Sequence, residues 1–193
     1  PLMQPAWMIV RKSIEDYLWD LHKNHGYDRV WTPHLAKEDL YITSWHAGHY
    51  LEDMFSVWGW TSKEKFHLKP MNCPHHMQIF ADNQFSYRDM PVRYFEPATV
   101  YRDEKTGQLS GLTRVRAITQ DDVHLFCRVG QIKDEVKLIR DIIKELVFYG
   151  YDIAQVELVD PAFDGYDGEF SIAIINDEIS ISKSVTFQAF KHF

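Results

Sequence analysis

The sequence has little cysteine, no long apolar run and no excess of positive charge. Its two cysteines, Cys73 and Cys127, are too few for a disulfide framework in 193 residues. No apolar stretch is long enough to cross a bilayer, and no secretory signal pattern is seen. The formal net charge of −7 excludes a domain that coats nucleic acid through a generally basic surface. We therefore expect a cytoplasmic protein without a membrane segment.

The amino-acid composition of the chain is that of a folded domain. Hydrophobic residues make up 45% and aromatic residues 15% of the chain, which excludes wholesale disorder. The length suits one domain with a core of its own. A helical period begins almost at the first residue, so we expect a piece of a longer protein.

Two helices and two long extended segments are predicted. Apolar residues recur at helical spacing over residues 7–24 and 131–149, and Gly26 and Gly150 are plausible terminators. Between them, "PVRYFEPATVYRDE" and "TRVRAITQDDVHLFC" are typical of strands, joined by the glycine-containing loop "KTGQLSGL". A short strand near residue 30, a brief helix in "KEDLYITSW" and a C-terminal hairpin through Asn176-Asp177 complete the pattern. The fold class is α+β, an antiparallel sheet flanked by helices.

One face of the second extended segment is unusually polar. Because side chains alternate along a strand, its even-numbered positions share a face. These positions are Arg114, Arg116, Ile118, Gln120, Asp122 and His124, with Glu96, Val100, Arg102 and Glu104 in matching phase on the first segment. Two interpretations stay open. The face is either a solvated outer surface, or a binding surface with arginines for an anion at one end and Gln–Asp–His for a small polar group at the other.

The stretch "HLKPMNCPHH" places Cys73 between prolines and next to a histidine pair. Taken alone, such a cysteine is by default a small buried hydrophobe, with metal ligand and nucleophile as alternatives. No oxyanion-hole or nucleophile signature accompanies it, which disfavours nucleophilic catalysis. We expect His75 and His76 not to be ligands, Cys127 to be a core residue and Asp121 to be a structural hydrogen-bonding partner.

Several motifs together resemble the catalytic domain of the threonyl-tRNA synthetase family, a class II aminoacyl-tRNA synthetase family. They are "KPMNCPHH", "YRDEKTGQLSGLTRVRAITQDDVHLF" and the motif 1-like "IVRKSIEDYLWDLHKNHGYDRVWTPHLAKEDL". The resemblance implies an incomplete class II synthetase-like fold. Residues 1–151 would form the core with motifs 1 and 2, and residues 152–193 divergent C-terminal strands of the same domain. We find no motif 3.

The resemblance also implies site residues. It assigns ATP to Arg102, Glu104 and Arg114, threonine to Met71, Gln120 and Asp122, and zinc to Cys73 and His124, with a third zinc ligand not identified. Arg102 and Arg114 would be the catalytic residues, because amino-acid activation needs charge stabilisation on phosphate rather than a protein nucleophile. A zinc ion with three protein ligands keeps a position open for threonine.

The implied function is that of a threonine–tRNA ligase fragment, which activates threonine with ATP and Mg²⁺ for transfer to tRNA(Thr). The alternative is a non-catalytic synthetase-like module that binds nucleotide, tRNA or a partner synthetase. A third possibility is a plain zinc-binding structural domain. The family's motif 1 builds a dimer interface, so we also expect a homodimer through the N-terminal region. Trp7, Trp19 and Trp31 lie there, and each of them fits either an interface or the core.

Overall fold

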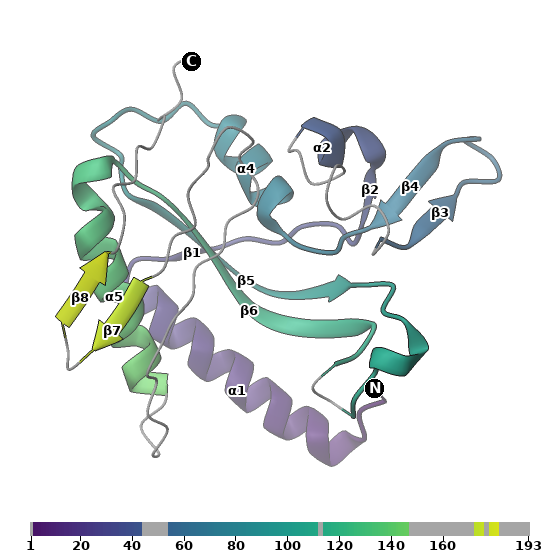
Figure 1. Cartoon of the computed structure of the whole chain (residues 1–193), viewed down its shortest axis with the longest axis horizontal. Coiled ribbons are helices and arrows are strands. Elements are labelled where there is room, and N and C mark those ends of the chain that lie inside the picture. Colours follow the sequence, from purple (N-terminus) through teal and green to yellow (C-terminus); the bar gives the residue numbers. More distant parts are fainter. Residues whose placement is uncertain (1, 44–53, 112–113, 147–171, 176–177, 182–193) are drawn as a thin grey trace. The chain divides into compact units, whose positions relative to one another are not determined.

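The computed structural model describes residues 2–43, 54–111, 114–146, 172–175 and 178–181 (Figure 1). The chain divides into two compact units, of which the first comprises Pro1–Ser86 and Val92–Leu125. The second comprises Tyr87–Pro91 and Phe126–Phe193. Within the described ranges, no helix is both long enough and apolar enough to span a membrane.

The first unit is built on a three-stranded sheet. Its order is β1–β5–β6, with β1 Asp28–Arg29, β5 Val92–Tyr101 and β6 Ala117–Phe126. β5 and β6 run antiparallel: the Arg102 N–H donates to the Arg116 carbonyl across 3.0 Å, and the hydroxyls of Thr99 and Thr119 lie 2.9 Å apart. β1 joins β5 in parallel. The predicted α+β class with two long antiparallel strands is therefore confirmed. The short strand predicted near residue 30 is also present as β1, and its parallel pairing was not predicted.

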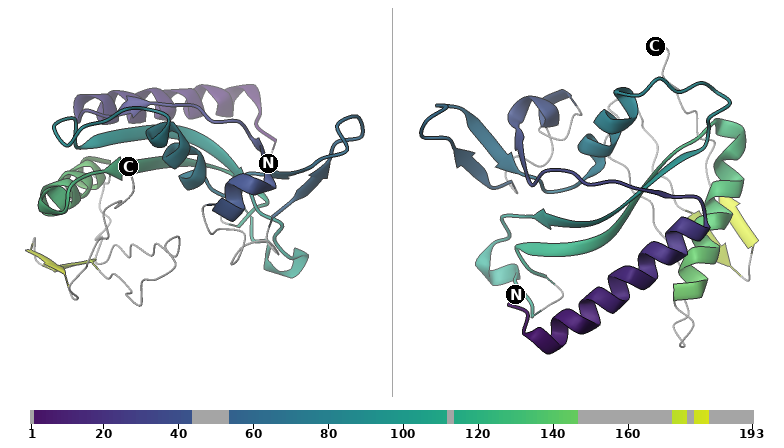
Figure 2. Two further views of the ribbon diagram at one scale, coloured as in Figure 1. Left: turned by 90° about the horizontal axis from the view of Figure 1, so that it is seen from above. Right: turned by 180° about the vertical axis from the view of Figure 1, so that it is seen from behind.

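Two helices lie against opposite faces of this sheet (Figure 2). They are α1, Pro5–Asn24, and α4, Cys73–Ala81. On one face, the α1 rings of Trp19 and His22 stack on Phe95 with centroids 5.8 and 4.4 Å away. On the other face, His76 of α4 bonds to Glu96 at 2.9 Å. Odd- and even-numbered residues of β5 thus point to different layers, as alternation predicts.

The ends of α1 follow from two special residues. Pro5 stands at its start, where a missing N–H leaves no bond unmade. At the other end, the N–H groups of His25 and Gly26 donate to the carbonyls of His22 and Lys23. Gly26 has φ +78°, a conformation that costs a side-chain-bearing residue more than glycine. The predicted helix and its terminator are both confirmed.

Pro97 lies inside β5, where a proline normally removes a sheet hydrogen bond. The Phe95 carbonyl accepts from Val30 N–H, so odd-numbered residues of β5 direct their backbone groups toward β1. The β1 ladder ends at the pair Arg29 and Phe95. Pro97 is two residues farther along, beyond that ladder, so its missing N–H leaves no sheet bond unmade.

A second small sheet belongs to the same unit and precedes α4 in the chain. Its order is β2–β4–β3, with β2 Leu35–Lys37, β3 Ser56–Trp58 and β4 Lys65–Leu68, next to the short helix α2, Glu38–Thr43. Tyr41 and Met54 form a small core with Ala36. His67 is fully buried, and its Nε2 lies 3.1 Å from Glu38. The brief helix was predicted; the β3–β4 pair was not.

The described residues of the second unit form one long helix and one hairpin. Its elements are η3 Val129–Gln131, α5 Ile132–Leu146, β7 Ile172–Ile175 and β8 Glu178–Ile181. Gln131 caps the helix start: its side-chain oxygen accepts from Arg128 N–H at 2.9 Å and its amide donates to the Met90 carbonyl at 3.0 Å. β7 and β8 pair antiparallel, which confirms the predicted hairpin. The strand predicted in "AQVELV" lies outside the described residues.

Candidate functional site

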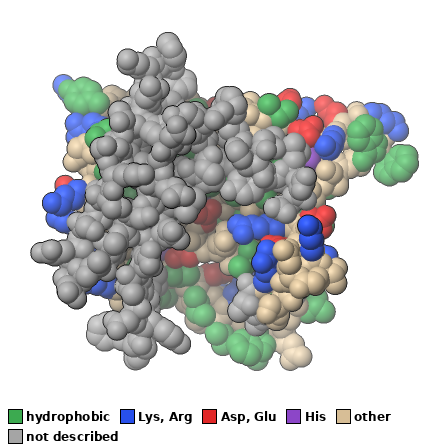
Figure 3. Space-filling view, viewed as in Figure 1, with side chains coloured by type: hydrophobic (Ala, Val, Ile, Leu, Met, Phe, Trp, Pro, Cys, Tyr) green, Lys and Arg blue, Asp and Glu red, His purple; other side chains and the backbone are tan. Residues whose placement is uncertain are grey.

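The loop that leaves β5 gathers charged side chains at the end of the sheet. The Arg114 guanidinium holds the Glu104 carboxylate with two contacts, 2.9 Å from Nε and 2.8 Å from Nη2. Arg102, at the base of the loop, donates from Nε to the Pro70 carbonyl at 3.4 Å. Figure 3 shows Lys and Arg side chains next to acidic ones over this end of β5 and β6. The loop end is therefore rich in arginine donors suited to phosphate or carboxylate.

The segment before α4 lies alongside the end of β5. Tyr101 N–H donates to the Lys69 carbonyl at 2.8 Å, and Lys69 N–H donates to the His34 carbonyl at 2.9 Å. These bonds fix the position of the next residues, including the half-buried Met71. Pro70 accepts from Arg102 and Asn72 donates to Asp122, so the segment carries Met71 between these two positions of the sheet.

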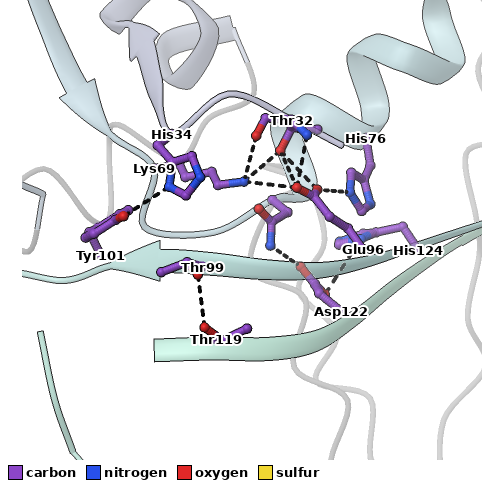
Figure 4. Close-up of polar contacts among 11 residues, drawn as sticks. Thr32, His34, Lys69, His76, Glu96, Thr99, Tyr101, Thr119, Asp122 and His124 are labelled. Carbon is purple, nitrogen blue, oxygen red and sulfur yellow. Dashed lines mark hydrogen bonds and ion pairs between the residues drawn. The ribbon is translucent and has the colours of Figure 1, made fainter. Parts of the chain in front are cut away.

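One short hydrogen bond joins α4 to β6. Asn72, just before the helix, donates from Nδ2 to Asp122 Oδ2 across 2.6 Å. Cys73 is the first residue of α4, and His124 lies two residues beyond Asp122 on the same face of β6. His124 Nδ1 lies 3.8 Å from Asp122 Oδ1, and the His76 ring meets the His124 ring edge-on at 4.6 Å (Figure 4). The structure therefore brings the segments of Cys73 and His124 together.

A buried polar cluster lies behind these residues, centred on the Glu96 carboxylate (Figure 4). Oε1 accepts from the Thr32 N–H at 3.0 Å and from the Lys69 ammonium at 3.2 Å. Oε2 accepts from the Thr32 hydroxyl at 3.0 Å and lies 2.9 Å from His76 Nε2. All four residues are at most 3% exposed. We name Thr32, Lys69, His76 and Glu96 the Glu96 cluster.

Two pKa shifts mark this part of the unit. Burial raises the pKa of Glu96, but the bonds from His76 and Thr32 and the Lys69 charge outweigh it and lower that pKa to about 2. Burial, aided by the Lys69 charge, lowers the pKa of His75 to about 4. Both His75 ring nitrogens are buried and have no hydrogen-bond partner among the described residues. Glu96 is thus a carboxylate and His75 a neutral imidazole at neutral pH.

The sequence-predicted site residues fall into two groups on the even-numbered face. Arg102, Glu104 and Arg114 lie at the loop end. Asp122 and His124 lie toward the middle of the sheet, on the side of α4, whose first residue is Cys73. Gln120 lies between the groups, two residues from Asp122 and about 13 Å along the strand from Arg116. The polar face predicted from alternation is thus one surface with an arginine end and an Asp–His end.

The model of the tRNA synthetase class II core domain (G, H, P, S and T) matches residues 56–185. The chain belongs to this class II tRNA synthetase family. Its curated relatives include the threonine–tRNA ligases of Porphyromonas gingivalis and Rubrobacter xylanophilus. The former is 47% identical over 165 residues and the latter 45% over 159. The matches cover 83% and 82% of this chain but 25% of each relative, so the chain spans about a quarter of their length.

Solved structures agree with the class II synthetase assignment. The structure of the RNA binding domain of threonyl-tRNA synthetase from Cryptosporidium parvum superposes with a TM-score of 0.71 at 34% identity, covering 75% of this chain and 36% of that one. Giardia lamblia prolyl-tRNA synthetase, solved with prolyl-adenylate, superposes with a TM-score of 0.71 at 17% identity. That match covers 93% of this chain and 38% of the other and supports the fold alone. The resemblance predicted from the motifs is confirmed.

The opposite face of this synthetase-like sheet is structural. Asp121 Oδ1 lies 3.5 Å from Nε2 of the buried His22 on α1. Burial raises the pKa of Asp121, partly offset by His22. Thr119 on the same face accepts from Arg11 of α1 at 3.2 Å. Asp121 therefore lies beside α1 and away from the polar face, and its predicted role as a hydrogen-bonding partner stays a prediction.

Lys69 and Asn72 were not singled out from the sequence. Both lie in the turn between β4 and α4, where no alternation or helical period indicates which way a side chain points. The only signal was their position inside "HLKPMNCPHH". Glu96 was more accessible to prediction, because it shares the phase of Arg102 along β5.

Proposed function

We propose that the chain is part of the catalytic domain of a threonine–tRNA ligase and binds threonine and ATP for adenylate formation. The observation that carries the proposal is the single polar face of β5 and β6. It has an arginine-rich loop at one end and the Asn72–Asp122 bond beside Cys73 and His124 at the other. An amino acid and the α-phosphate of ATP must meet on one surface for this reaction.

The arginine end would hold ATP. Arg102 and Arg114 would contact phosphate oxygens and stabilise the charge that develops as threonine's carboxylate attacks the α-phosphorus and pyrophosphate leaves. Glu104 would lie near the adenine. Mg²⁺ would accompany the phosphates, as a hard cation that prefers oxygen ligands. Arg114 would then exchange its present Glu104 partner for phosphate.

The Asp–His end would hold threonine. Asp122 would accept a hydrogen bond from threonine's hydroxyl. Met71 and Gln120 would line the rest of the threonine site. The Asn72 bond leaves Asp122 with further lone pairs, since a carboxylate accepts about four hydrogen bonds. A site built around a hydroxyl discriminates against valine, which lacks one.

Two residues at this end have the chemistry of zinc ligands. A cysteine thiolate and a histidine imidazole are both donors that zinc prefers, and Cys73 and His124 lie on the segments joined by Asn72. Among the described residues, no group of three His, Cys, Asp or Glu side chains lies close enough to hold a metal ion. We propose Cys73 and His124 as two ligands. Zinc, when bound, would supply a Lewis acid for threonine's amino and hydroxyl groups.

The proposal includes tRNA(Thr) and a second copy of the chain as partners. The outer side of α1 exposes apolar side chains, with Trp7 63% and Ile9 72% exposed, and Trp31 after β1 is 72% exposed. Such exposure suits an interface between copies. Trp19 is instead half-buried and packs on Phe95. Sedimentation of the Ile9→Asp variant against the unchanged chain tests the dimer.

Threonine-dependent ATP–pyrophosphate exchange tests the activity, with zinc content measured on the same sample. We expect exchange with threonine, none with valine, and loss of exchange in Arg102→Gln. A folded chain that binds ATP without exchange would contradict the ligase activity and favour the non-catalytic module. Loss of the fold on zinc removal would favour a structural zinc domain instead.

A further inference from the structure

Three arginines lie on the polar face. Arg102 and Arg114 are assigned to ATP, whereas Arg116 has no assigned ligand. It lies next to the start of β6, with its backbone carbonyl accepting from Arg102 N–H at 3.0 Å. Arg114, two residues earlier on the same face, contacts Glu104. The two arginines therefore share a face but differ in what their guanidinium groups contact.

The Arg116 side chain is directed at the first turn of the loop. Nε donates to the Glu104 carbonyl at 3.1 Å, and Nη2 donates to the Thr106 hydroxyl at 3.4 Å. Nε also lies 3.9 Å from the Asp103 carboxylate. One guanidinium thus contacts three neighbouring loop residues, which its planar fork of donors makes possible.

This part of the loop has few other bonds. After β5 ends, the described backbone bonds within the turn are Glu104 N–H to the Arg102 carbonyl at 2.8 Å, Gln108 N–H to the Lys105 carbonyl at 2.8 Å and Leu109 N–H to the Thr106 carbonyl at 3.4 Å. The Glu104 carbonyl is the acceptor that Arg116 occupies. Because the carbonyl and side chain of Glu104 belong to one residue, fixing the former restricts where the latter points.

We propose that Arg116 is a positioning residue for the ATP end of the site. It holds residues 103–106 so that Glu104 faces the adenine position, and it does not contact phosphate itself. The inference rests on the proposed ATP site for its functional consequence. Its structural part, an ordered loop turn, does not depend on that site.

Two substitutions of Arg116 distinguish the effect of its forked hydrogen-bond donors from the effect of its positive charge. Arg116→Gln removes both, whereas Arg116→Lys keeps the charge and reaches one acceptor at a time. Arg11→Gln is the matched control, because Arg11 is a half-exposed arginine that contacts the opposite face of the same sheet through Thr119. All variants are made in the full chain, and their melting temperatures are compared first.

The first readout is native trypsin cleavage after the exposed Lys105, followed by mass spectrometry. We expect cleavage there to be about fivefold or more faster in both Arg116 variants than in the unchanged chain and Arg11→Gln. The second readout is calorimetric binding of Mg-ATP. We expect about tenfold weaker binding in both Arg116 variants, with melting temperatures unchanged.

Equal cleavage after Lys105 in Arg116→Gln and the unchanged chain would overturn the inference. So would full ATP binding by Arg116→Lys, since charge alone would then suffice and Arg116 would act as a phosphate ligand. Absence of ATP binding by the unchanged chain is a different result. It would overturn the proposed function, while the cleavage rates would still decide whether Arg116 holds the loop.

Discussion

His76 donates a hydrogen bond from Nε2 to the buried Glu96 carboxylate across 2.9 Å. Because Glu96 is ionised, it can only accept, so the proton of this bond lies on the His76 nitrogen. The same His76 ring meets His124 edge-on at 4.6 Å. The Glu96 cluster therefore supports the ring of a proposed zinc ligand from behind.

Replacing Glu96 with glutamine should destabilise the first unit. The neutral amide cannot accept from His76, Lys69 and Thr32 together, and the buried Lys69 would lose its counter-charge. We expect the free energy of unfolding to fall by about 3 kcal/mol at pH 7, measured by urea denaturation. Glu64→Gln, at the exposed pair with Lys37, is the control and should have no measurable effect. Equal losses in the two variants would contradict the role of the Glu96 cluster.

The effect of Glu96 should depend on pH. Its pKa is about 2 in the folded chain against an ordinary 4.5, so the folded state favours the carboxylate. The resulting stability is complete above about pH 4.5 and is lost as the pH falls through about 2. The difference in unfolding free energy between the unchanged chain and Glu96→Gln should therefore shrink from pH 5 to pH 2.5. A difference that is constant over this range would count against a depressed Glu96 pKa.

His75 should be replaceable by an apolar ring. Its imidazole is buried without a hydrogen-bond partner in the described part of the chain and contacts Tyr41 edge-on at 6.2 Å. Leaving such a group unpaired costs about 1–3 kcal/mol, which His75→Phe would remove. We expect the variant to be at least as stable as the unchanged chain at pH 7 in urea, with chelator present. A loss of stability in His75→Phe at pH 7 would show that the imidazole has a partner after all.

His75→Phe should also reduce the pH dependence of stability at pH values above the range in which Glu96 titrates. The His75 pKa is lowered from 6.5 to about 4, so its neutral form stabilises the fold above pH 6.5 and this stability declines as the pH falls toward 4. The loss is at most about 3 kcal/mol for a shift of this size. His75→Phe should lack this decline, compared by urea midpoints at pH 7 and pH 4.5. Parallel declines in both chains would contradict it.

Asn72→Ala should weaken amino-acid binding and leave ATP binding unchanged. Asn72 fixes Asp122 with a 2.6 Å bond, so its removal lets the carboxylate turn away from threonine's hydroxyl. We expect about tenfold weaker threonine binding by calorimetry. The control is Asn83→Ala, since the exposed Asn83 side chain, just after α4, donates to the Ile79 carbonyl. Equal threonine affinities in the two variants would show that Asn72 does not contribute to threonine binding.

Much of the first unit could be predicted from the sequence. Alternation along residues 113–127 correctly separated the face of Asp122 from the face of Asp121, and the apolar period of residues 7–24 located α1. The β3–β4 pair and α4 were missed, because short elements with mixed composition have no clear period. Pro74 near the start of α4 was the available signal for that helix.

The Glu96 cluster could not be predicted from the sequence. Thr32, Lys69 and His76 come from three separate segments, and a lysine is rarely fully buried. Only the folded chain shows that the Lys69 charge is compensated by Glu96 at 3.2 Å. The boundary at residues 151 and 152 and the roles assigned to the eight site residues stay predictions.

The most direct test of the central claim is calorimetric binding of a non-hydrolysable threonyl-adenylate analogue, threonyl-sulfamoyl adenosine. It spans both ends of the polar face and requires no turnover. We expect one analogue to bind per chain, with affinity at least about tenfold higher than for the valyl analogue and reduced in Arg102→Gln and Asp122→Asn. No binding by the folded, zinc-supplemented chain, or equal affinity for the threonyl and valyl analogues, would contradict it.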